Sequence, residues 1–124
     1  SSISYLTRKI NGLAIETSWL EMGRILKVLS KRMKPEKYKQ LLTEITTSER
    51  TAFYLAAIVT RLDSQQIKVP QDIGWRKMAE MAPAITYDNQ VIIFEKIRQH
   101  TREELIEMRR IEAHPSTPHR LKQD

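Results

Sequence analysis

With 124 residues, the chain is long enough to bury one hydrophobic core and too short for two ordinary domains. It contains no Cys, which excludes disulfides, thiolate nucleophiles and Cys-ligated zinc, and no apolar run approaches the roughly 20 residues that span a bilayer. Its net charge of +6 gives a modest attraction to polyanions, which matters where the basic residues cluster. We expect a cytoplasmic protein with no membrane association.

Apolar periodicity predicts three helices in the first half of the chain. The first covers about residues 14–32, with apolar positions at Ile15, Trp19, Met22, Ile25, Leu26 and Leu29. Pro35 suits the first turn of a short second helix, whose stripe is Tyr38, Leu41, Leu42 and Ile45. The segment Thr46–Glu49 has capping-box spacing and opens a third helix over about 48–62. The apolar face of this helix holds Ala52, Leu55, Ala56, Val59 and Leu62, widened by Phe53 and Ile58.

Three further helices are predicted after a polar loop from Asp63 to Gln71. The fourth contains Trp75, Met78 and Met81 and ends at Pro83, with Gly74 near its start permitting close packing. The fifth covers about 91–97, and the sixth begins at the capping-box segment Thr101–Glu104 and ends near Ala113. The sequence thus predicts an all-α fold, a compact five- or six-helix domain over residues 1–113, with 114–124 as a polar tail or linker.

Groups that could carry catalysis are sparse. His100, His114 and His119 do not share a metal-binding pattern, and Glu103, Glu104 and Glu107 have the spacing of a solvated helix face. There is no Gly-rich phosphate loop and no Ser in a nucleophile-elbow sequence. We therefore expect no enzyme activity, no cofactor and no metal.

Basic residues concentrate around the end of the first predicted helix and the start of the second. They are Arg24, Lys27, Lys31, Arg32, Lys34, Lys37 and Lys39, with Glu36 the one acid nearby. Such a patch suits contact with phosphate groups. It equally suits cations that complement a helix C-terminus and a solvated surface, and the patch alone leaves both interpretations open.

The segment from Tyr38 to Leu55 combines a short helix, a three-residue polar turn and a Ser-x-Arg-Thr-Ala start of a helix. In this it resembles helix-turn-helix DNA-binding proteins, in which the second helix enters the major groove. The resemblance implies that Ser48 and Thr51 contact phosphate and that Glu49, Arg50 and Tyr54 face the groove, and that Ile45, Ala52 and Leu55 pack the two helices together. Two positions depart from the common pattern: Leu42 stands where a small residue is frequent, and Thr46 where Gly is frequent.

Together with the segments 73–78 and 101–105, this arrangement looks like helical proteins encoded by bacterial plasmids and phages. The resulting hypothesis is a regulatory or DNA-maintenance protein that binds double-stranded DNA, with Lys27, Lys31, Arg32, Lys34, Lys37 and Lys39 on the phosphates. The alternative is a protein-interaction adaptor or inhibitor whose fourth and fifth helices offer an adaptable, Met-containing surface at Met78 and Met81. A homodimer or a protein partner is compatible with either. Trp19 and Trp75 are expected in the core, and the main interpretation of Met22, Met33, Met78, Met81 and Met108 is that they fill gaps in it; the Met-containing surface belongs only to the alternative.

Overall fold

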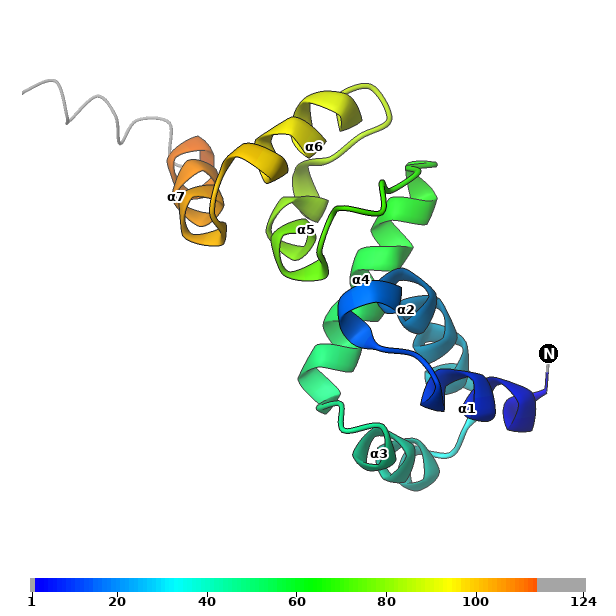
Figure 1. Ribbon diagram of the computed structural model, residues 1–124. Helices are drawn as coiled ribbons and strands as arrows, with labels where there is room; N and C mark the ends of the chain where they lie inside the picture. Colours follow the sequence, from blue (N-terminus) through cyan, green and yellow to red (C-terminus); the bar gives the residue numbers. More distant parts are fainter. Residues whose placement is uncertain (1, 114–124) are drawn as a thin grey trace, which may run out of the picture.

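The structure is a computed structural model that describes residues 2–113, and within this range it is all-helical, which confirms the predicted fold class. Its elements in chain order are α1 (Ile3–Asn11), α2 (Ile15–Arg32), α3 (Pro35–Glu44), α4 (Glu49–Ser64), α5 (Trp75–Met81), the 3-10 turn η1 (Ala82–Ala84), α6 (Gln90–Gln99) and α7 (Arg102–Ala113) (Figure 1). The predicted tail at 114–124, with His114 and His119, lies outside the described residues.

Helix α1 was not predicted, and it brings the described helices to seven where five or six were expected. The Ser2 side chain caps it by accepting a hydrogen bond from Tyr5 N at 3.1 Å. Ile10 is fully buried, and Lys9 Nζ lies 3.0 Å from Glu21 Oε2 of α2. A nine-residue helix is marginal alone in water, so the packing of Ile10 stabilises α1 more than its own propensity does.

Helices α2 and α4 run antiparallel and form the centre of the fold. Trp19 Nε1 donates to the carbonyl of Ile73 at 3.0 Å, so the start of α2 lies beside the loop before α5. Arg24 Nη2 lies 2.9 Å from Asp63 Oδ1, so the middle of α2 lies beside the end of α4. The buried apolar cluster around them runs from Ile10 in α1 to Leu105 in α7.

Gly23 sets how closely α2 and α4 approach. A Cβ at this position would lie 2.6 Å from Val59 Cγ2 and 2.9 Å from the carbonyl oxygen of Leu55. The second atom is backbone, so it cannot move aside without moving α4. Gly74, by contrast, has nothing within 4 Å of such a Cβ. The expectation that Gly74 permits close packing is therefore wrong, and Gly23 has that role.

We expect Gly23→Ala to lower the free energy of unfolding by about 2 kcal/mol. Overpacking costs up to about 3 kcal/mol, and the better helix propensity of Ala returns about 1 kcal/mol. Denaturant unfolding followed by circular dichroism measures the change. Gly12→Ala is the control, since its nearest neighbour would be Lys9 O at 3.7 Å. Equal stability of the two variants would show that the interface between α2 and α4 accommodates the added methyl group.

The C-terminal helices pack on α4 through α5 and η1. Arg61 of α4 donates from Nε to the carbonyl of Ala82 at 3.1 Å and from Nη2 to that of Ile85 at 2.8 Å. The predicted capping box of α7 is confirmed, because Thr101 N donates to Glu104 Oε1 at 2.9 Å and Glu104 N donates to Thr101 Oγ1 at 3.1 Å. Met78 and Met81 are 0% and 3% exposed, so they belong to the core and the predicted Met-containing surface is wrong.

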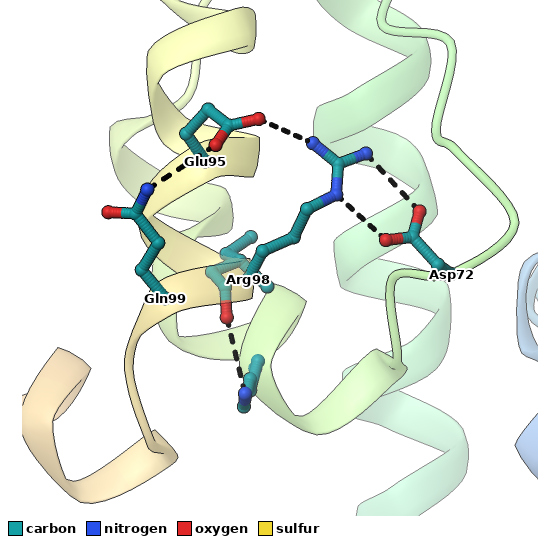
Figure 2. Close-up of polar contacts among 6 residues, drawn as sticks. Asp72, Glu95, Arg98 and Gln99 are labelled. Atoms are coloured by element: carbon teal, nitrogen blue, oxygen red, sulfur yellow. Dashed lines mark hydrogen bonds and ion pairs between the residues drawn. The ribbon is translucent and has the colours of Figure 1, made fainter.

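An arginine clamp joins α6 to the loop that precedes α5 (Figure 2). Arg98 donates from Nε to Asp72 Oδ2 at 2.7 Å, from Nη2 to Asp72 Oδ1 at 3.2 Å and from Nη1 to Glu95 Oε2 at 3.1 Å. The hydrogen bonds from Arg98 lower the pKa of Asp72 and raise the pKa of Arg98 itself. Because the pKa of Asp72 is depressed, the clamp contributes to stability above the ordinary pKa of an aspartate and is lost as acid protonates it.

Candidate functional site

The positions of α3 and α4 that were expected to face inward are buried. Leu41 and Leu42 of α3 are 3% and 2% exposed, and Ala52 and Leu55 of α4 are 1% and 0% exposed, so the predicted inner faces are confirmed. Tyr38 is half-buried; its burial, with a smaller contribution from the charge of Glu49, raises the pKa of its phenol. The two helices are joined by residues 45–48.

Thr46 gives this turn its sharp reversal. Its φ is 53°, the left-handed conformation that favours glycine. Thr47 N donates to Leu42 O at 2.9 Å and Thr46 N donates to Thr43 O at 3.2 Å, the hydrogen bonds of a Schellman C-cap. Thr46 therefore adopts the backbone conformation that Gly would supply in the common helix-turn-helix pattern.

We expect Thr46→Gly to stabilise the protein by about 0.5–1 kcal/mol. The left-handed conformation costs a residue with a side chain about 1–2 kcal/mol, and the greater freedom of Gly in the unfolded chain cancels part of this gain. Thermal unfolding measures the effect. Thr43→Gly is the control: Thr43 lies inside α3, and the substitution should destabilise the protein by about 0.3 kcal/mol. A lower melting temperature for Thr46→Gly would mean that the Thr46 side chain stabilises the turn.

The start of α4 is capped by Ser48. Its Oγ accepts a hydrogen bond from Thr51 N at 3.0 Å and lies 3.0 Å from Thr51 Oγ1. The predicted capping box between Thr46 and Glu49 is not formed; Glu49 Oε2 instead lies 3.9 Å from Lys39 Nζ. Capping is thus an observed role of Ser48, while phosphate contact by Ser48 and Thr51 stays a prediction.

Four lysines form a surface at the end of α2 and the start of α3. This lysine surface consists of Lys27, Lys31, Lys34 and Lys37. Lys27 is half-buried and the other three are exposed, and none of their four ammonium groups has an ion-pair or hydrogen-bond partner within residues 2–113. Arg24 does not belong to it, because its guanidinium is held by both carboxylate oxygens of Asp63.

The lysine surface and the first turns of α4 lie at the same end of the molecule. Since α2 and α4 are antiparallel and α3 connects them, the end of α2 and the start of α4 lie at the two ends of α3 (Figure 1). The ion pair between Lys39 and Glu49 joins α3 to the first residue of α4. Arg32 is exposed at the last position of α2. The predicted phosphate contacts of the basic patch and the N-terminus of α4 therefore share one end of the molecule.

The outer face of α4 is divided in two. Phe53 is 69% exposed, which corrects its predicted place in the apolar stripe. Arg50, Thr51 and Tyr54 instead line a cleft next to α5. The guanidinium of Arg50 lies 5.4 Å over the ring of Tyr54, and its Nε donates to Tyr54 Oη at 3.2 Å. The residues predicted to face the DNA groove are therefore separated. Glu49 lies next to Lys39 of α3, whereas Arg50 and Tyr54 line the cleft.

This cleft, of about 630 Å³, lies between α4, α5, η1 and α7. Four of its lining residues are arginines, Arg50, Arg61, Arg76 and Arg102, and we name it the arginine cleft. Trp75 also lines it. This side chain was expected in the core but is half-buried and packs against the core, and its buried Nε1 has no hydrogen-bond partner within residues 2–113. The sequence alone does not indicate this site, because its arginines come from three helices that only the tertiary fold brings together.

Two further features bear on function. Within residues 2–113, no group of three or more His, Cys, Asp or Glu is placed to hold a metal ion. No helix in the described range has the length and apolar character needed to cross a membrane.

Comparison with protein-family models, curated proteins and solved structures found no match to this chain. Its resemblance to helix-turn-helix proteins therefore rests on its own residues in α3 and α4.

Proposed function

We propose that this protein binds double-stranded DNA through the lysine surface and the first turns of α4, as a regulatory or DNA-maintenance protein of the plasmid or phage type. The observation that carries the proposal is the lysine surface itself, whose four ammonium groups have no partner within residues 2–113. Cations that served only to stabilise the fold would be expected to pair with carboxylates, as Arg24 does with Asp63. Unpaired lysines gathered at one end are instead suited to neutralising phosphates.

The turn between α3 and α4 supports the same proposal. The left-handed conformation of Thr46 corresponds to the position where Gly is frequent in helix-turn-helix proteins, and α4 begins at the same end of the molecule as the lysines. Glu49 and the exposed Phe53 are the side chains that α4 presents at that end. A glutamate can accept a hydrogen bond from cytosine N4, and an apolar ring can contact a thymine methyl group. The lysines would position the protein on the sugar-phosphate backbone of the DNA, and Glu49 and Phe53 would contact base edges.

One observation favours the protein-interaction alternative. At the start of α6, Tyr87, Val91 and Ile92 are 61%, 72% and 61% exposed, a cluster of large apolar side chains of the kind that marks protein interfaces. This face differs from the predicted Met-containing one. Val91→Ser together with Ile92→Ser should abolish binding of a protein partner, or of a second copy, and should leave DNA affinity unchanged.

A duplex titration at several salt concentrations tests the DNA proposal. Each phosphate neutralised by a lysine should contribute about −0.9 to the slope of log K against log salt. A steep negative slope with duplexes of unrelated sequence is the expected result. Absence of binding even at low salt would reject the proposal and favour the interface on α6.

A further inference from the structure

The positive charge of the four arginines in the arginine cleft exceeds the negative charge of the carboxylates that pair with them. Arg102 Nη2 lies 3.0 Å from Glu80 Oε2, and Arg76 Nη1 lies 3.2 Å from Glu16 Oε2. Arg50 and Arg61 have no carboxylate partner within the described residues. Arg61 is held by neutral carbonyl groups and Arg50 by the Tyr54 hydroxyl. Two guanidinium charges in one cleft are therefore left without a counter-charge.

These guanidinium groups are held in place before any ligand arrives. Arg61 donates to the carbonyls of Ala82 and Ile85, while Arg50 lies over the ring of Tyr54. Arg76 lies 4.8 Å over the ring of Trp75. Groups already ordered lose little conformational entropy on binding, so the cleft is preorganised for an anion.

The remainder of the cleft suits a flat or apolar body. Its wall includes Ala57, Ala79 and Pro83, together with the largely buried Ile58. A volume of about 630 Å³ admits an organic molecule and far exceeds the needs of a simple inorganic anion. Guanidinium planes that rest on aromatic rings can themselves stack against a base.

We propose that the arginine cleft binds a phosphate monoester carried on a flat ring system, the chemistry of a nucleoside 5′-monophosphate. A phosphate monoester carries about −1.5 to −2 charges at neutral pH and three acceptor oxygens, so it offsets the excess positive charge of the cleft better than a single carboxylate would. Arginine also binds phosphate through two parallel hydrogen bonds. The ligand is either a free nucleotide or the 5′-phosphorylated end of a nucleic-acid strand. The inference does not depend on duplex binding by the lysine surface.

Isothermal titration calorimetry with adenosine 5′-monophosphate and cytidine 5′-monophosphate tests the proposal. The expected result is saturable binding of one molecule per chain, with inorganic phosphate alone and adenosine alone each binding more weakly than the nucleotide. Arg50→Gln and Arg102→Gln should each weaken binding about tenfold or more, because the first removes a charged donor and the second leaves the Glu80 carboxylate unpaired in the cleft. Arg110→Gln is the matched control on α7, since Arg110 is exposed and does not line the cleft.

Two further measurements separate this site from the lysine surface and identify the source of the ligand. Lys37→Gln should reduce duplex affinity and leave nucleotide binding unchanged. Nucleotide binding that is absent, or that falls with Lys37→Gln and survives both cleft variants, would overturn the proposal whatever the duplex result. A 5′-phosphorylated oligonucleotide that binds more tightly than its 5′-hydroxyl form identifies a strand end as the source, and equal binding of the two identifies the free nucleotide.

Discussion

Ala52→Arg is expected to unfold the protein. Ala52 is 1% exposed on the face of α4 that packs into the core, with Leu55 of the same face fully buried. A guanidinium forced into this position would lose its hydration, and no carboxylate lies buried within residues 2–113 to receive it. An unpaired buried charge costs several kcal/mol, and a small domain is stable by only about 5–15 kcal/mol in total. Circular dichroism and thermal unfolding should show loss of the cooperative transition.

The neighbouring substitution Phe53→Arg provides a matched control for this experiment. It places the same side chain in the same helix, but Phe53 is 69% exposed, so the charge would stay in water. We expect Phe53→Arg to change stability by about 0.5 kcal/mol or less. A folded Ala52→Arg protein with an unchanged melting temperature would contradict the arrangement of the inner and outer faces of α4.

Replacing all four residues of the lysine surface by Gln is expected to remove most of the duplex affinity. If each lysine neutralises one phosphate, the slope of log K against log salt should become less steep by about 3.6. A fourfold rise in salt would then weaken the unmodified protein about 150-fold more than the variant. The substitutions should barely affect folding, because none of these ammonium groups has a partner within residues 2–113. Titrations at several salt concentrations, with unfolding curves for both proteins, check both statements.

A single-site comparison controls for net charge. Lys68→Gln removes one exposed charge from the loop between α4 and α5, at the opposite end of α4 from the lysine surface. Lys37→Gln should change the salt slope by about 0.9, and Lys68→Gln should change it little. If both variants alter the slope equally, or if the quadruple variant keeps the original slope, the lysine surface is a solvated face without a role in DNA binding.

Features that depend on residues within one helical turn could be predicted from the sequence. The box formed by Thr101 and Glu104 is one example, because both of its hydrogen bonds join residues three apart. The burial of Ala52 and Leu55 is another, because apolar spacing specifies which side of a helix turns inward. The same local reasoning predicted a box between Thr46 and Glu49. It was wrong because the left-handed Thr46 ends α3, and the cap that starts α4 is Ser48.

The sequence by itself determined the all-helical class, the approximate bounds of α2 to α7 and the clustering of the basic residues, since these follow from periodicity, caps and composition. Only the tertiary structure decided that α1 forms, that Gly23 and not Gly74 allows close packing, and that Phe53 is exposed. The tertiary structure also determined that the arginine cleft forms, because it brings Arg61, Arg76 and Arg102 of three different helices to line one cleft. The physical reason is that helix periodicity depends on neighbours up to four residues away, whereas the position of one helix against another depends on contacts between residues distant in the chain.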